Sequence, residues 1–442
     1  MSRASYLKIF PVIALAFTVQ LSFAQERTLT LQEAITLTLK NSYQLKASDA
    51  RIQQAIAAVK GATDNRLPNA SVSGSYLRLS NADISLKTNK PSGSSDSSGS
   101  SFPKVNQAAY GIANISLPIF TGGKIKYGIE SARYLEEATK LDAIHDRQSV
   151  IYNTINAYVN LYKASATALV VKENLEASRH RDSVFLRLEN NGLLARNDRL
   201  KAQLQTSQIE LSLLDLMNNQ KLAMINLNLM MGLPEETILV TDSTGFQLPN
   251  EIESILELQQ TALQNRNDLK AMKQRIHAAE TGISLSRADL YPSLALTGGY
   301  MAAYIPKVLT VTNAINVGIG LKYDIGSLWK TKSKVEMAKS KLAEVQANDS
   351  LLQNSIKLSL HKDFEQYLLS RKKILVYQNA VEQSEENFRI TQNKYNNSLV
   401  NTTELLEANV LMLQSKINLA VAKADEYLAY SKLLERTGNL SE

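Results

Sequence analysis

The sequence contains no cysteine among its 442 residues, which excludes several classes of protein. Without cysteine there is no disulfide framework and no thiol to carry a lipoprotein anchor. The histidines lack metal-ligand spacing and thiol partners, and no local Ser/His/Asp arrangement supports nucleophilic catalysis. We therefore expect no metal site, no cofactor and no enzyme activity. The four histidines are His145, His180, His277 and His361.

Aromatic residues are also scarce, at 6% of the chain. That content is low for a thick globular core, but it suits long helices that pack through narrow seams. The net charge of +7 is spread along the chain rather than gathered in a patch, which argues against nucleic acid as a partner. Beyond the N-terminal segment, no run of about 18 apolar residues is present, so we expect no membrane-spanning helix.

The N-terminus has the pattern of a secretory signal. Arg3 and Lys8 precede the apolar run, and Ser22 and Ala24 occupy the small-residue cleavage positions. We expect residues 1–24 to be a signal peptide that is cleaved after Ala24. An uncleaved membrane anchor is the alternative.

The rest of the chain contains an internal duplication. With an offset of 224, Pro68 aligns with Pro292, Gly74 with Gly298 and Tyr76 with Tyr300. Further along, an offset of 206 aligns Gly232 with Gly438. A tandem duplication of this length predicts two structural repeats, 25–232 and 255–442, joined by a linker over 233–254. The first repeat also contains a Ser/Gly-rich tract between Ser80 and Lys104, which suggests an exposed loop.

Each repeat shows the same order of expected elements: a helix, a strand pair, a very long helix and a shorter helix. The first repeat predicts helices over 29–66, 122–190 and 198–232, and strands over 70–86 and 105–120. The second repeat predicts helices over 255–290, 328–396 and 404–438, and strands over 293–305 and 312–326.

The strand prediction rests on alternation. In the last strand Ile315, Val317, Ile319 and Leu321 are apolar, while the residues between them are small or polar. A soluble β-sandwich has the same pattern. Two observations favour strands whose apolar face contacts lipid. Four strands are few for a sandwich of this size, and small polar residues would line the opposite face of the sheet. Tyr76, Tyr300, Tyr304 and Phe120 would form an aromatic girdle.

Four strands cannot close a barrel, because the smallest common barrels need about eight. An open sheet edge cannot face hydrocarbon. If these strands span a membrane, several chains must therefore each contribute four. The expected long helix 122–190 would reach roughly 100 Å, about the length of helices 29–66 and 198–232 placed end to end. These lengths favour a tube that projects from a membrane barrel.

The duplication, the strand pairs and the run Leu117-Pro-Ile-Phe-Thr-Gly-Gly123 resemble the TolC family of outer-membrane efflux proteins. The resemblance covers essentially the whole mature chain. Pro118, Gly122 and Gly123 form the expected strand-to-helix turn, whose second copy, YDIGSLWK, has lost the proline and the Gly-Gly pair.

The resemblance implies a homotrimer in the outer membrane of a Gram-negative bacterium. Its fold would be mainly α with a small β part. Long antiparallel helices would form an α-barrel tunnel in the periplasm, below a 12-stranded β-barrel in outer membrane lipid. The implied partners are a periplasmic adaptor protein and an inner-membrane pump of a tripartite efflux or type I secretion system.

Two segments, NNGLLARNDRLKA (190–202) and NNSLVNTTELLEA (396–408), are the same helix turn in the two repeats. A plain turn between helices would use the same Gly and Asn residues. The resemblance instead implies that these turns contact the adaptor. The residues concerned are Asn191, Gly192, Leu193, Asp198, Ser398 and Leu399.

Glu404 and Glu407 also have two readings. Asn401 can cap the helix with Glu404 at its third position, where acids are favoured. The i, i+3 spacing also places both carboxylates on one helix face. The resemblance implies that both acids, with Tyr395, form a periplasmic gate, where threefold symmetry would gather six carboxylates. The family's gate arginine aligns with Val400, so the latch must differ here.

We conclude that the sequence predicts a trimeric outer-membrane channel that provides a passive exit duct. An exported structural or adhesive coiled-coil protein of the cell envelope is the alternative.

Overall fold

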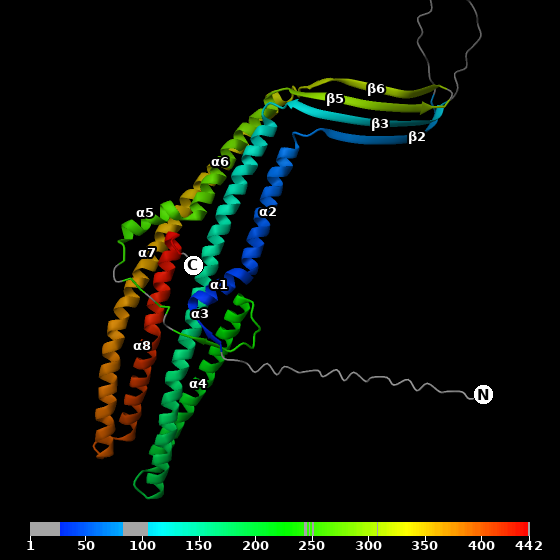
Figure 1. Cartoon of the computed structure of the whole chain (residues 1–442). Helices are drawn as coiled ribbons and strands as arrows, with labels where there is room; N and C mark the ends of the chain where they lie inside the picture. The colour runs from blue at the N-terminus through cyan, green and yellow to red at the C-terminus, as the bar shows by residue number, and fades with distance from the viewer. Residues whose placement is uncertain are drawn as a thin grey trace, which may run out of the picture.

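The computed structural model describes residues 27–82, 105–242, 245–246, 248–249, 252–306 and 308–440. The predicted signal peptide and most of the Ser/Gly-rich tract lie outside these residues. Two long helical hairpins hang from a four-stranded sheet, which extends sideways from one end of the helices (Figure 1). We call the opposite end, where both hairpins turn, the lower end.

The same order of elements occurs in both halves of the chain. The first half contains β1 (Arg27–Leu29), α1 (Leu31–Asn41), α2 (Tyr43–Asp64), β2 (Asn69–Ala82), β3 (Val105–Phe120), α3 (Lys124–Asn190) and α4 (Arg196–Met231). The second half contains β4 (Leu239–Thr241), α5 (Ile255–Asn265), α6 (Asn267–Arg287), the short 3-10 helix η1 (Ala288–Leu290), β5 (Ser293–Ile305), β6 (Leu309–Lys322), α7 (Ser327–Asn396) and α8 (Thr402–Thr437).

One unbroken helix was expected at the start of each repeat, over 29–66 and 255–290. This prediction was wrong, because each of these segments forms two helices. Ser42 leaves the helical conformation, and its hydroxyl accepts a hydrogen bond from the N–H of Leu45 at the start of α2. Asn41 then turns its side-chain amide to the carbonyl of Met231, at the end of α4. Arg266 makes the matching break between α5 and α6. These breaks let the chain cross from one helix layer to the next at mid-height.

The last strand begins earlier than the expected 312 and ends before 326. Asn313 has a positive φ of 60°, and the β5–β6 register shifts there, between Met301 and Ala303. This bulge interrupts the alternation, so the pattern alone misses the first residues of β6. After Lys322, the Asp324 carboxylate accepts a hydrogen bond from the N–H of Gly326, and α7 starts one residue later.

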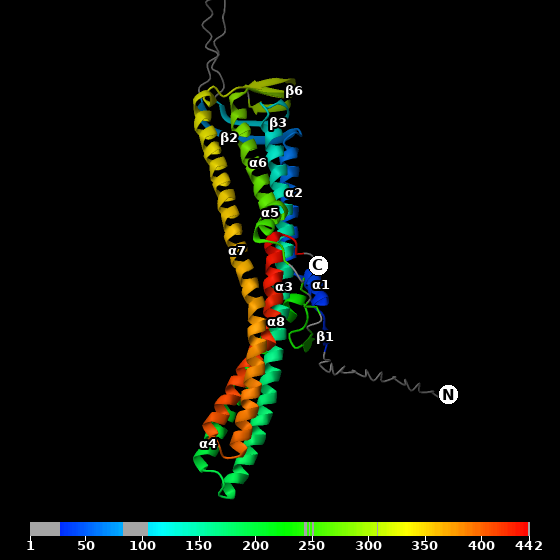
Figure 2. The ribbon, with the colours of Figure 1, turned by 90° about the vertical axis from the view of Figure 1, so that its left-hand side faces the viewer.

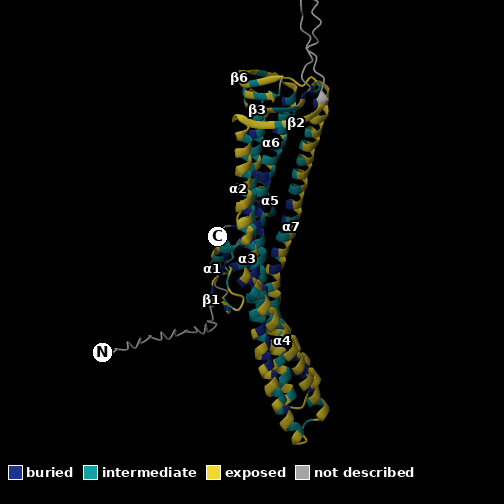
Figure 3. Cartoon of the chain, turned by 90° about the vertical axis from the view of Figure 1, so that its right-hand side faces the viewer, coloured by how far each residue is buried: buried dark blue, intermediate teal, exposed yellow. Residues whose placement is uncertain are grey.

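α3 and α7 run almost the whole length of the helical part (Figures 1 and 2). With 67 and 70 residues, they reach about 100 and 105 Å at ~1.5 Å per residue. α2 packs on the upper half of α3 and α4 on its lower half, while α6 and α8 divide α7 in the same way. Buried side chains form a narrow seam with exposed residues on both sides (Figure 3).

The sheet order is β2-β3-β5-β6, and all neighbours are antiparallel. Its register places Ile115 opposite Gly298 and Val317 opposite the same glycine, so these apolar residues share one face. Asn114, Gly299 and Asn316 share the other face. Both faces of the isolated sheet are largely open, and the apolar side chains of β6 are strongly exposed, with Val317 at 78%.

At mid-height, Tyr158 of α3 joins the helices to the linker between the repeats. Its hydroxyl donates to the carbonyl of Leu29 at 2.7 Å and accepts from the N–H of Asp242 at 3.1 Å. β1 and β4 pair in parallel beside it. Phe246 packs edge-on against the Tyr158 ring and stacks on Tyr427. Complete burial raises the pKa of Tyr158 to about 12, so the phenol stays protonated and keeps its donor.

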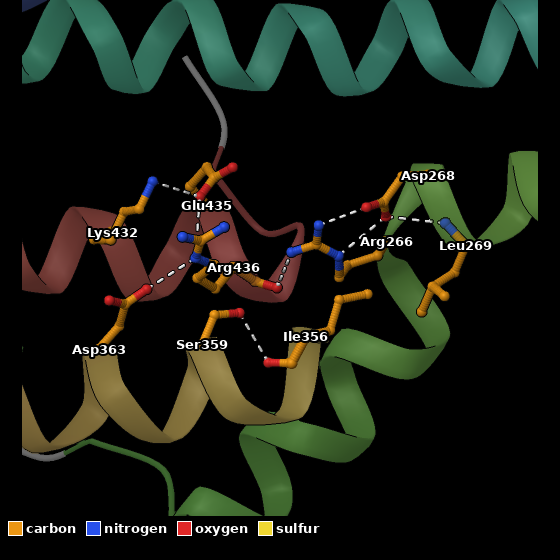
Figure 4. A network of polar contacts seen from close by, with 9 residues as sticks. All are labelled: Arg266, Asp268, Leu269, Ile356, Ser359, Asp363, Lys432, Glu435 and Arg436. Carbon is orange, nitrogen blue, oxygen red and sulfur yellow. Dashed lines mark hydrogen bonds and ion pairs between the residues drawn. The ribbon is translucent and has the colours of Figure 1, made fainter. Parts of the chain in front are cut away.

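A second polar cluster fixes the break between α5 and α6 against the end of α8 (Figure 4). The guanidinium of Arg266, only 6% exposed, donates twice to Asp268 and once to the carbonyl of Arg436. Arg436 in turn donates to Asp363 of α7 at 2.8 Å. Burial favours the neutral acid, but the Arg266 hydrogen bonds outweigh it and hold the pKa of Asp268 below its usual value. Three helices are thus held together by charged groups that are paired within the chain.

We predict that Arg266→Met destabilises the fold by about 3–5 kcal/mol, because it leaves the buried Asp268 carboxylate without its partner. The double variant Arg266→Met/Asp268→Asn should be less destabilised than the single one. The pKa of Asp268 is lower in the folded protein than in the unfolded chain. The carboxylate therefore contributes to the free energy of unfolding at pH values above the unfolded pKa of about 3.9, and this contribution is lost as the pH falls through the folded pKa. Thermal denaturation between neutral pH and about pH 3 measures both effects.

The control is Lys341→Met, which breaks a pair exposed on both sides, Lys341 with Glu344. We expect its cost to stay below about 1 kcal/mol. An Arg266→Met protein as stable as the Lys341→Met protein would contradict this account.

Candidate functional site: the paired helix turns

The turn between α3 and α4 ends the first hairpin. Gly192 has a φ of +70°, and its N–H donates to the carbonyl of Glu189 while the N–H of Leu193 donates to that of Leu188. These two bonds form a Schellman motif, which satisfies the last carbonyls of the helix. The Asn191 side chain donates to a third, the carbonyl of Arg187. The last carbonyl groups of α3 are thus hydrogen-bonded within the turn. The side chain that the turn presents to solvent is Leu193, which is 75% exposed.

The turn between α7 and α8 has the same geometry with a different residue at its centre. Ser398 takes the left-handed conformation, with a φ of +59°, and its N–H bonds to the carbonyl of Tyr395. The N–H of Leu399 bonds to the carbonyl of Lys394, and Leu399 is 73% exposed. The Asn397 side chain bonds to the carbonyl of Asn393, as Asn191 does in the first turn. Both hairpins therefore end in a rigid turn that presents one leucine to solvent.

The helices that leave these turns each begin with an acid in the first turn. Asp198 of α4 lies 3.4 Å from the ammonium group of Lys201. On α8, the side-chain oxygen of Asn401 accepts the N–H of Glu404, and its amide donates to the Glu404 carboxylate at 3.0 Å. The expected cap is therefore present. The cap differs from a capping box in one bond. The Glu404 carboxylate accepts from the side-chain amide of Asn401, whereas in a capping box it would accept from the backbone N–H of the capping residue.

Glu404 and Glu407 are both exposed on α8. Glu407 lines a shallow, mostly apolar groove between α4 and α8, together with Lys201, Leu204 and Leu411. The two carboxylates therefore lie on an open surface of the isolated chain, where other chains can approach them.

The structure places Tyr395 away from that surface. Its ring packs against Phe185 of α3, with ring centroids 5.6 Å apart, and its hydroxyl lies 3.4 Å from the Thr402 hydroxyl. Ala202 and Leu405 are buried in the same cluster. Tyr395 thus ties the first turn of α8 to the other hairpin, and it lies beside the acids without sharing their exposed face.

Sequence reasoning missed the polar contacts that join the two hairpins above this cluster. Asn174 of α3 and Asn409 of α8 exchange side-chain hydrogen bonds of 3.3 and 3.5 Å, and both are buried. Gln205 of α4 donates to the carbonyl of Leu406. A signal existed in the sequence: Asn174 lies three residues after Val171 and directly before Leu175, which are both apolar and buried.

At the upper end, the strand-to-helix turn contains both glycines in the left-handed conformation, Gly122 at +64° and Gly123 at +89°. A Cβ on Gly122 would lie 2.7 Å from the carbonyl oxygen of Ala288, so any larger residue would displace η1. Pro118 lies next to a register shift of β3, where its missing N–H is tolerated. The second copy of the turn closes through Asp324 and has no left-handed glycine.

Two searches of the described residues bear on function. No helix within them is apolar enough over a sufficient length to cross a membrane. No three His, Asp or Glu side chains in that part of the chain are placed to hold a metal ion together.

The two turns have glycine and serine at equivalent positions, Gly192 and Ser398, so exchanging these residue types should change stability in opposite directions. Ser398→Gly should stabilise the α7–α8 hairpin by up to about 1 kcal/mol, because glycine adopts the left-handed conformation without strain. Gly192→Ser should destabilise the α3–α4 hairpin by about the same amount, since nothing contacts the position of its Cβ and only backbone strain changes. Thermal midpoints of the two variants should move in opposite directions, and shifts of the same sign would refute the shared geometry.

Comparisons with known proteins agree on one family. The family described as "Outer membrane efflux protein" matches residues 34–233 and 258–439. The outer membrane efflux protein BepC of Brucella suis is 20% identical over 394 residues, which are 87% of this chain and 85% of BepC.

Solved structures show the same fold. The outer membrane channel CmeC of Campylobacter jejuni superposes with a TM-score of 0.77 at 19% identity, over 92% of this chain and 85% of CmeC. The outer membrane protein VceC of Vibrio cholerae gives 0.74 at 17% identity, over 92% of this chain and 96% of VceC. The predicted fold class of long antiparallel helices with four strands per chain is therefore confirmed. With the family matched over both halves, the chain belongs to the outer membrane efflux proteins.

Proposed function

We propose that three copies of this chain form the outer membrane duct of a tripartite efflux or type I secretion system. Substrates driven by an inner-membrane pump would leave the periplasm through it. Membership of the family supports the channel role and the location in the outer membrane, with the helices in the periplasm. The family is a class of transport channels, and the exported adhesive coiled coil receives no support from it.

The observation that carries the oligomer is the sheet. β2 and β6 are both edge strands, and each has an unpaired row of backbone N–H and C=O groups. Such edges cannot face hydrocarbon. If β6 of one copy pairs with β2 of the next, three copies give twelve strands and no edge. The two repeats within each copy, 25–232 and 255–442, would then act as six pseudo-equivalent units around the duct.

The helices support the same assembly. Large apolar side chains remain exposed along α4 in one chain, at spacings of four, seven and eleven residues that place them on one face of the helix. They are Leu200, Leu204, Leu211, Leu222 and Leu229.

At the lower end we assign a cation-sensitive gate to Glu404 and Glu407. Both are exposed in one chain, so threefold symmetry can bring six carboxylates around the axis. A ring of this kind attracts cations and holds the mouth narrow through bridging ions. Tyr395 supports the gate by packing, because it fixes the start of α8 against Phe185.

We assign the adaptor contact to the two turns. The exposed Leu193 and Leu399 are small apolar contacts on rigid loops, next to Asn191, Gly192 and Ser398. Asp198 adds a charge in the first turn of α4, where it pairs with Lys201. Surfaces of this kind suit end-on docking of a partner with matching apolar tips.

The trimer is tested with the purified full-length protein. We expect a trimer in detergent that dissociates on heating, and single-channel conductance in planar bilayers. A protein that stays monomeric and conducts no current would overturn the proposed function.

The gate is tested with Glu404→Gln/Glu407→Gln in the same bilayers. We expect half-block by a multivalent cation to need at least about tenfold more cation, because six carboxylates are lost; tenfold corresponds to about 1.4 kcal/mol. The matched control is Glu173→Gln/Glu176→Gln, an exposed pair with the same spacing on α3. Unchanged block in the first variant would remove both acids from the gate.

A further inference from the structure

The helices that leave the sheet begin differently from most others in the chain. A helix N-terminus favours negative charge, and five helices carry an acid in their first turn. They are α1 with Glu33, α4 with Asp198, α5 with Glu257, α6 with Asp268 and α8 with Glu404. α3 and α7 have none there and carry lysines in their first two turns, Lys124 and Lys126 in α3 and Lys330, Lys332 and Lys334 in α7. Helix stability does not explain these cations.

Two of these five lysines form ion pairs with a single acid. Asp289 of η1 bonds to Lys124 at 2.8 Å and to Lys334 at 2.6 Å. This shared carboxylate also shows that the starts of α3 and α7 lie on either side of η1. Lys126, Lys330 and Lys332 are exposed, and no described residue forms an ion pair with them. Within the described part of the chain, three cations without an ion-pair partner therefore remain at the junction of sheet and helices, although the Lys126 ammonium group lies 5.9 Å from the centre of the Tyr127 ring.

Apolar side chains connect these lysines to the apolar face of the sheet. Leu321 is the last such residue of β6, and the next large apolar side chains along the chain are all exposed, up to Trp329 at 65%. The intervening residues are Tyr323, Ile325 and Leu328. Lys330 directly follows Trp329. An aromatic side chain next to lysines, a few residues after a strand with an exposed apolar face, is typical of a membrane–water interface.

We propose that Lys126, Lys330 and Lys332, with Trp329, form a basic collar that binds the phosphate groups of anionic phospholipids in the periplasmic leaflet of the outer membrane. The inference rests on the proposed placement of the sheet across that membrane. Charge complementarity selects the occupant, because the collar offers ammonium groups that no described carboxylate pairs with, and the leaflet offers phosphates at the same level. The collar would fix the height of the duct in the membrane.

The test uses Trp329, the chain's single tryptophan, as a reporter at the collar. The full-length protein is reconstituted into phosphatidylethanolamine vesicles. These contain either brominated phosphatidylglycerol or brominated phosphatidylethanolamine, at equal mole fraction, as a short-range quencher. We expect the anionic lipid to be enriched at Trp329 at least about threefold, and less so at high salt.

The variant Lys126→Gln/Lys330→Gln/Lys332→Gln should lose the preference for the anionic lipid. The control Lys221→Gln/Lys357→Gln/Lys372→Gln removes the same charge from exposed positions further along the helices and should keep it. Equal quenching by both lipids, or a preference that survives in the collar variant, would overturn the proposal.

Quenching by aqueous iodide without quenching by either lipid would place Trp329 in the channel lumen, and this too would overturn it. Conductance recorded on the same preparations separates the two hypotheses. A protein that conducts without a lipid preference refutes the collar alone, and one that does not conduct refutes the channel.

Discussion

Every peptide group of a sheet edge in hydrocarbon needs a hydrogen-bond partner, and the rest of this molecule depends on that requirement. An unpaired group there costs several kcal/mol, and β2 and β6 each have a whole row of them. Four strands cannot satisfy these groups alone. Copies that add side by side in an open sheet always leave two free edges, so only a closed ring removes the cost. If the sheet lies in the outer membrane, as we propose, oligomerisation is a condition of folding there.

A closed ring explains why the helices look incomplete in one chain. Each strand pair continues into a helix of about 100 Å, so in the proposed trimer the curvature of the closed barrel would extend to the helices beneath it. A helix in the wall of a tube needs neighbours on both sides, and the outermost helices of one chain have a neighbour on one side only. The narrow buried seam and the exposed leucines of α4 are then two consequences of one geometry.

Much of this could be predicted from the sequence, because its strongest signals are local or repeated. Alternation located the strands, and the duplication identified 396–408 as the counterpart of 190–202. The misses share a different cause. The breaks at Ser42 and Arg266 depend on Met231 and Arg436, which lie about 190 and 170 residues away along the chain. The inward packing of Tyr395 likewise depends on Phe185. No periodic pattern carries such information, because helical spacing continues unchanged through both breaks.

The absence of an arginine at Val400 can be weighed against the contacts that this chain does have. The side chains of Asn174 and Asn409 are buried and bonded to each other, and each of the two bonds adds about 1 kcal/mol. Their larger effect is on register. Sliding α8 along α3 by one turn would leave two amides buried without partners, at about 1–3 kcal/mol each. The same shift would take Asp425 away from Lys163, which it meets at 2.8 Å. Within one chain, the register of the two hairpins is thus fixed by contacts that involve neither Glu404 nor Glu407, and both of these carboxylates stay exposed to solvent.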